Sequence, residues 1–130
     1  RRMTTERTAP GQPLQVKNAT RGTDLVRCGR VADNAWTRLV GLLGSAGLAD
    51  GEGLLIAPCS SIHMFFMRFS IDAVYLNRDL EVVGLDADLK PWRIGRFYRG
   101  AHYVLELPVG AIAASATEVG DRVVIEGYRL

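Results

Sequence analysis

The apolar residues of this sequence come in short runs, and the tight turns between these runs limit the fold more than any other feature. Runs in which apolar and polar residues alternate indicate strands, because strand side chains point to opposite faces in turn. A doubly wound α/β sheet needs a crossover helix between successive strands, so this pattern excludes it. The predicted strands are residues 14–18, 24–32, 54–57, 62–69, 72–76, 80–85, 103–107 and 122–128.

Two segments predict helices. Residues 35–43 place apolar side chains at spacings of three and four, and Asp33 or Asn34 precedes them as a cap. Residues 109–116 are rich in alanine and predict one or two helical turns. We therefore expect an α+β fold with a mostly antiparallel bent sheet or partly closed β-barrel. It would hold seven to eight short strands and one or two short helices.

The chain length suits one domain. A chain of 130 residues can bury one hydrophobic core. Residues 1–13 contain two prolines and many polar residues without an apolar period, so we expect a disordered N-terminal arm. Residues 14–130 are the predicted domain.

The charge of the chain is concentrated at its start. The net charge is +2, and three arginines with one glutamate in the first ten residues already supply that +2. The remainder is formally neutral, which argues against specific nucleic-acid recognition, since that interface needs a concentrated positive field.

The sequence also bears on the compartment. No stretch approaches the ~20 apolar residues that cross a bilayer, and the arginine-rich start does not lead into an apolar signal core. These features favour a cytoplasmic protein. The chain begins at Arg1 instead of Met, so an exported form remains open. We expect Cys28 and Cys59 to be free thiols, because two cysteines are not a secreted disulfide pattern.

Cys59 and His63 are the sharpest pair for catalysis. A cysteine nucleophile needs a nearby base, and four residues on a helix would bring the two side chains together. On a strand they would lie about 13 Å apart. The strand prediction therefore disfavours a dyad, and a cysteine-dependent hydrolase or transferase stays as the alternative function.

Two carboxylates, Asp72 and Glu106, sit inside apolar strands. A buried carboxylate is costly unless it has a partner, so we expect ion pairs, with Arg68 and Arg38 as the candidate partners. An acid/base site that includes Asp72 is the alternative.

A metal site or cofactor is not expected. The available ligands lack any paired spacing such as C-x-x-C or H-x-x-x-H, and no glycine-rich phosphate loop is present. These ligands are Cys59, His63, Asp72 and His102.

A basic, aromatic segment is the best binding feature outside the core. Cations recur every three residues at Lys90, Arg93, Arg96 and Arg99, with aromatic residues between them. Guanidinium groups beside aromatic rings hold anions or peptides. The sequence therefore favours a non-catalytic binding module for a small polar or anionic ligand or a peptide. The predicted contact residues are His63, Arg68, Trp92, Arg93 and Arg96. A solvated basic loop and a structural module of a larger assembly remain as alternatives, and the oligomeric state is not indicated.

Several short motifs follow one another along the chain: Arg38-x-x-Gly41-Leu42-Leu43, Gly53-Leu54-Leu55, I-H-M-F-F-M-R-F-S-I-D at 62–72, Lys90-Pro91-Trp92, V-L-E-L-P-V-G at 104–110 and Val119-Gly120-Asp121. Their order resembles the bacterial and archaeal family called DUF192. The resemblance covers about residues 14–130 and implies a small domain of uncharacterised biochemical role, often exported in other members. Many members read Phe-Trp-Met-Lys-Asn-Thr in the central element. Here the tryptophan position is His63 and the lysine and asparagine positions are Phe65 and Phe66, so that polar pair is absent.

Overall fold

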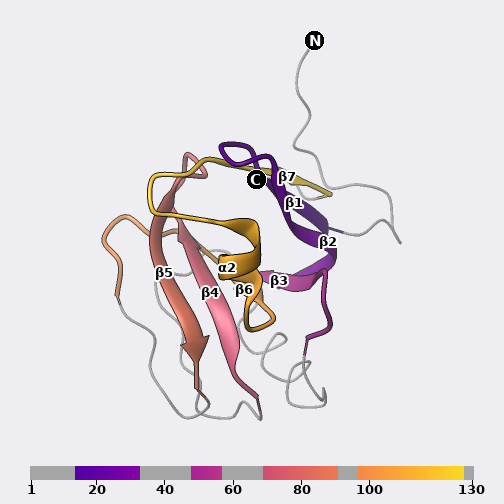
Figure 1. Cartoon of the computed structure of the whole chain (residues 1–130). Helices are drawn as coiled ribbons and strands as arrows, with labels where there is room; N and C mark the ends of the chain where they lie inside the picture. The colour runs from indigo at the N-terminus through magenta and orange to yellow at the C-terminus, as the bar shows by residue number, and fades with distance from the viewer. Residues whose placement is uncertain (1–13, 33–47, 57–68, 91–96, 128–130) are drawn as a thin grey trace.

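A computed structural model describes residues 14–32, 48–56, 69–90 and 97–127, and most of these residues lie in strands (Figure 1). The elements are β1 (Leu14–Asn18), β2 (Thr23–Ala32), β3 (Glu52–Ile56), β4 (Ile71–Leu76), β5 (Val82–Leu89), β6 (Tyr103–Leu107), α2 (Ala111–Ser115) and β7 (Val123–Glu126).

The seven described strands form one sheet in the order β5-β4-β6-β3-β2-β1-β7. Among them, every neighbouring pair is antiparallel except β2 and β3, which run parallel from Cys28↔Glu52 to Ala32↔Ile56. The sheet is therefore mostly antiparallel, as expected, and the parallel pair of β2 and β3 makes it a mixed sheet. Parallel neighbours need a long connection, and residues 33–51 supply it.

The sheet curls until its two edges meet, so it forms a partly closed barrel (Figure 1). The start of β5 lies against the start of β7 through a bridge between Glu81 and Arg122. The Val82 N–H donates to the Asp121 carbonyl at 2.8 Å, and the Val123 N–H donates to the Leu80 carbonyl at 2.9 Å. These bonds satisfy backbone groups that an open sheet would leave exposed at its edges.

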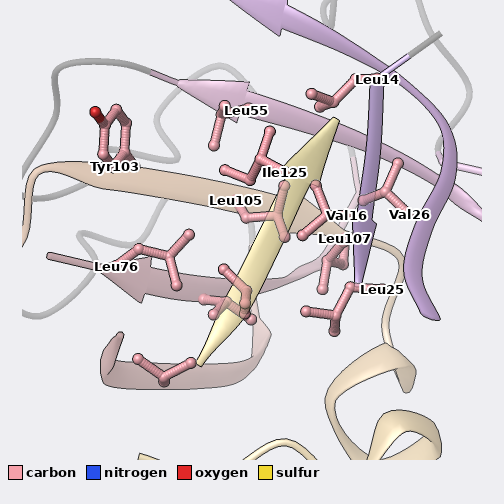
Figure 2. Packing of buried hydrophobic residues seen from close by; sticks show 13 residues of the cluster. Leu14, Val16, Leu25, Val26, Leu55, Leu76, Tyr103, Leu105, Leu107 and Ile125 are labelled. Atoms are coloured by element: carbon pink, nitrogen blue, oxygen red, sulfur yellow. The ribbon is translucent and has the colours of Figure 1, made fainter. Parts of the chain in front are cut away.

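Two apolar clusters lie on opposite faces of the sheet, as the alternation of strand side chains requires. The first fills the inside of the curl, where residues of β1, β2 and β7 meet residues of β4 and β6 (Figure 2). Ala111 and Ile112 of α2 pack against this inner cluster. The second cluster lies on the outer face and consists of Leu54, Ile56, Ile71, Ala73, Tyr75 and Val104.

The structure bears out most of the predicted elements and corrects one. Strands 14–18, 72–76 and 103–107 are confirmed, and helix 109–116 is present as α2. Strand 80–85 was predicted too short, because β5 continues to Leu89 by pairing with Ile71 at the start of β4. The second half of β5 is rich in polar residues, so the sequence pattern did not indicate that it pairs with β4. Helix 35–43 and residues 62–68 lie outside the described residues.

Candidate functional site

Most of the predicted site residues lie outside the part of the chain that the structure describes. This applies to Cys59, His63, Arg68, Trp92, Arg93 and Arg96, so their roles stay predictions. Asp72 is described, and so are both ends of the basic segment, Lys90 and residues 97–99. Cys28 is a free, exposed thiol.

Asp72 is a buried carboxylate whose partners are backbone N–H groups. Its Oδ1 accepts the Asp88 N–H at 2.8 Å, while its Oδ2 accepts the N–H groups of Gly110 at 3.1 Å and Ile112 at 3.0 Å. Asp88 has a φ of 53°, and the β4–β5 register shifts beside it, so β5 contains a bulge at this point. The carboxylate of Asp72 therefore connects this bulge to the first turn of α2. A negative charge is favourable at that end of a helix. This geometry supports a structural role for Asp72. The expected partners, Arg68 and Arg38, lie outside the described residues.

A second carboxylate, Asp86 of β5, organises the outer face of the sheet. The Tyr75 hydroxyl donates to Asp86 Oδ2 at 2.9 Å, and the Tyr98 hydroxyl lies 2.8 Å from Asp86 Oδ1 and 2.9 Å from the Leu85 carbonyl. The two tyrosine rings are 4.5 Å apart at 45°. Both oxygens of Asp86 therefore bind hydroxyl groups from different elements. No sequence signal singled out Tyr75 or Asp86, because neither stands in a motif.

Gly84 lets Tyr98 lie flat against β5. Gly84 is the register partner of Tyr75, and any Cβ at this position would overlap the ring of Tyr98. A glycine inside a strand commonly marks such a close approach. The ring of Tyr98 is thus fixed by a steric fit to Gly84 as well as by its hydroxyl group.

Glu106 is a further polar residue on the outer face of the sheet. Asp86 of β5 and Glu106 of β6 are both register partners of Ala73, one on each side of β4. Two strand spacings separate their backbones, roughly 10 Å. The side chain of Glu106 is fully buried, as its position in an apolar strand predicted. We call Tyr75, Asp86, Tyr98 and Glu106 the outer-face cluster.

Tyr98 also begins a tight turn at the surface. The Ala101 N–H donates to the Tyr98 carbonyl at 3.1 Å, and Gly100 has a φ of 82°, a conformation that favours glycine. Phe97 and Arg99 flank the anchored ring and are exposed, and 72% of the Phe97 surface is open to solvent. The anchor therefore displays a phenyl ring and a guanidinium group from a fixed backbone.

Within the described ranges, no group of three or more His, Cys, Asp and Glu side chains is arranged to hold a metal ion. No helix among the described residues is long and apolar enough to cross a membrane.

Comparison with known proteins places the chain among uncharacterised proteins. Residues 16–125 match the family model DUF192, described as uncharacterized ACR. A UPF0127 protein of Pyrococcus furiosus is 38% identical over 110 residues, covering 81% of this chain and 92% of that protein. A UPF0127 protein of Thermococcus sibiricus is 35% identical over 111 residues, covering 82% of this chain and 71% of that protein.

Two solved structures share the fold. A protein of unknown function from Novosphingobium aromaticivorans superposes with a TM-score of 0.72 at 20% identity, covering 95% of this chain and 98% of that one. A putative transcription regulator from Sinorhizobium meliloti superposes with a TM-score of 0.72 at 23% identity, covering 88% and 92%. Identities this low support a common fold alone.

Proposed function

The chain belongs to the DUF192 family of uncharacterised proteins, and on that premise we propose that it is a non-catalytic binding module for a small polar or anionic ligand or a peptide. The observation that carries this proposal is the display of Phe97 and Arg99 on either side of the anchored Tyr98. The predicted contact residues Trp92, Arg93 and Arg96 directly precede this surface in the chain.

Three physical points support the proposal. A ligand that covers the exposed phenyl ring removes apolar surface from water. This burial favours binding by about 25 cal/mol per Å² of apolar surface. A guanidinium group beside it gives planar, charge-assisted hydrogen bonds to carboxylate or phosphate oxygens. The hydrogen bonds of Tyr98 and the fit against Gly84 hold the backbone in place, so little ordering entropy is lost on binding.

Ligand-induced thermal stabilisation across a panel of small anions, sugar derivatives and short peptides tests the proposal. For any compound that stabilises the protein, we expect Phe97→Ala and the double variant Arg93→Glu/Arg96→Glu to lose most of the stabilisation. The matched control is Arg30→Glu, which reverses an exposed cation on β2. It should keep the stabilisation. A panel without a single stabilising compound, or equal stabilisation in all variants, would contradict the proposal.

A further inference from the structure

Among the described residues, two cations at one end of the sheet form no ion pair with a carboxylate. Within the described ranges, Arg21, Arg27, Lys90 and Arg122 each form an ion pair. Arg78 and Arg99 are exposed and form none there. Both lie in turns at the end of the sheet where β4 finishes and β6 begins.

The backbone brings these two turns close together. The last register pair of β4 and β6 is Leu76↔Tyr103, and the His102 N–H extends the ladder by donating to the Leu76 carbonyl at 2.7 Å. Arg78 follows Leu76 by two residues, and Arg99 precedes His102 by three. His102 therefore lies between the two turns.

The turn that carries Arg78 is held by the side chain of Asn77. Its Oδ1 accepts the N–H groups of Asp79 and Glu81, each at 2.9 Å. The carboxylate of Glu81 is already bound by Arg122 at 3.0 Å and by the Asn77 amide at 3.2 Å. Glu81 is thus engaged away from Arg78, while Asp79 is the other acidic residue of this turn and is exposed.

The turn that carries Arg99 is fixed by Tyr98, whose ring lies against Gly84 and whose hydroxyl group lies 2.8 Å from Asp86 Oδ1. Both arginines therefore project from backbones that are already ordered. Only their side chains lose freedom when an anion binds, which lowers the entropic cost.

His102 adds a third nitrogen donor. Its half-buried ring packs edge-on against Tyr103, with centroids 4.6 Å apart at 88°. Burial and, secondarily, the charge of Arg78 lower the pKa of His102 below its ordinary value. A lowered pKa favours the neutral imidazole, which carries one N–H donor.

We propose that Arg78, Arg99 and His102 bind a phosphate group, either as free phosphate or as a phosphomonoester. The inference rests on the proposed function, of which it names the charged group of the ligand. Two guanidinium groups offset the charge of a phosphate group, which lies between about −1 and −2 near pH 7, and planar guanidinium donors match its oxygens. An exposed site of this kind binds weakly, with a Kd on the order of 1 mM.

Proton NMR titration of the two histidines of the full chain tests the site, with His102→Gln to assign the signals. Inorganic phosphate, matched in ionic strength with chloride, should raise the pKa of His102 by about half a unit because the anion offsets the repulsion from Arg78. Arg78→Gln and Arg99→Gln should each remove most of this phosphate-dependent rise. Arg30→Gln, an exposed cation on β2, should leave it intact. An unchanged pKa in phosphate, or an equal rise in all variants, would overturn the site.

The same titration with glycerol phosphate separates the two sources of the phosphate group. Tighter binding of the ester supports a phosphomonoester ligand, and equal binding supports free phosphate. Comparison with Phe97→Ala separates this inference from the proposed function. If the pKa of His102 does not change in phosphate or glycerol phosphate, while Phe97→Ala still reduces the thermal stabilisation by panel ligands, the phosphate site is wrong and the binding module stands. A phosphate response that Phe97→Ala leaves unchanged, with no other panel compound stabilising the protein, leaves the phosphate site standing and contradicts the part of the proposed function that rests on Phe97.

Discussion

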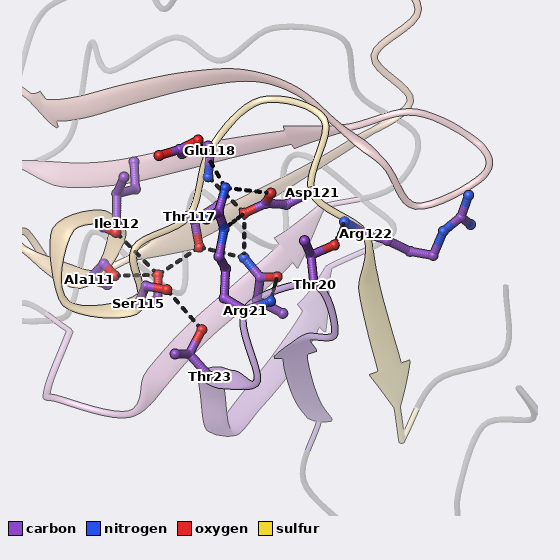
Figure 3. Close-up of polar contacts among 11 residues, drawn as sticks. Thr20, Arg21, Thr23, Ala111, Ile112, Ser115, Thr117, Glu118, Asp121 and Arg122 are labelled. Carbon is purple, nitrogen blue, oxygen red and sulfur yellow. Dashed lines mark hydrogen bonds and ion pairs between the residues drawn. The ribbon is translucent and has the colours of Figure 1, made fainter.

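Replacing Asp121 by Asn should destabilise the protein in a way that depends on pH. The carboxylate is only 3% exposed and lies where the barrel edges meet. Its Oδ2 accepts hydrogen bonds from Asn18 Nδ2 at 3.0 Å, Arg21 Nε at 3.0 Å and the Glu118 N–H at 2.9 Å. Figure 3 shows how these contacts join the turn after β1 to the segment before β7.

The size of the effect follows from the pKa of Asp121. The hydrogen bond from Arg21 is the main cause that lowers this pKa from 3.8 to about 2, with further bonds from Asn18 and the Glu118 N–H, against the opposing effect of burial. A depression of this size contributes at most about 2 to 3 kcal/mol to the free energy of unfolding, because each pKa unit corresponds to about 1.4 kcal/mol. The value is an upper bound because the Arg21 side chain is 35% exposed to solvent.

The sign of the pH dependence is determined by the lowered pKa. The stabilisation is fully present above pH 3.8 and is lost as the pH falls toward 2, because the unfolded chain takes up the proton first. Asp121→Asn should therefore cost about 2 kcal/mol at pH 7 and only about 1 kcal/mol at pH 3. Other carboxylates titrate in both proteins, so their contribution cancels in the comparison.

Urea unfolding of the parent and the variant at both pH values measures the two differences. The matched control is Asp50→Asn, whose side chain is 98% exposed and lies 3.7 Å from Arg27. It should cost no more than about 0.5 kcal/mol at either pH. Equal costs for the two variants at pH 7, or a cost for Asp121→Asn that does not shrink at pH 3, would refute the reasoning.

Two further substitutions test the structural roles of Asp72 and Gly84. Asp72→Asn places an amide donor against a backbone N–H group, so it should cost about 1–3 kcal/mol in urea unfolding and speed hydrogen exchange at the amide of Asp88 or of Ile112. Unchanged hydrogen exchange at both amides would contradict the proposed link between β5 and α2 through Asp72. Gly84→Ala should cost about 1–3 kcal/mol because the new Cβ overlaps the ring of Tyr98, and the cost should fall sharply in a Tyr98→Ala background. A cost that persists in that background would mean that the ring is not the obstacle.

Strand positions were predictable where one face of a strand is buried. β1 alternates between buried and exposed residues along its whole length, and so does β7. Local alternation is enough to identify such strands because the core imposes it on the sequence. The second half of β5 failed this test: its polar residues follow no simple alternation, and only pairing with β4 makes it a strand.

The outer-face cluster was beyond the reach of sequence reasoning for a related reason. Tyr75, Asp86 and Tyr98 come from three separate segments, and register with Ala73 and Gly84 brings them together. The basic segment after β5 was recognised from its composition, yet the anchoring role of Tyr98 depends on a glycine 14 residues earlier in the chain.

The amino-acid sequence alone determined the family and the β-rich class, because ordered motifs and short alternating runs are local properties. Only the tertiary structure decided the parallel pairing of β2 with β3, the closure of the barrel and the hydrogen-bond partners of Asp72 and Asp121. Asp72 meets donors 38 and 40 residues away, and Asp121 meets Asn18 103 residues away. What a buried charge does is determined by the donors that the fold brings to it, and most of those donors are not its neighbours in the chain.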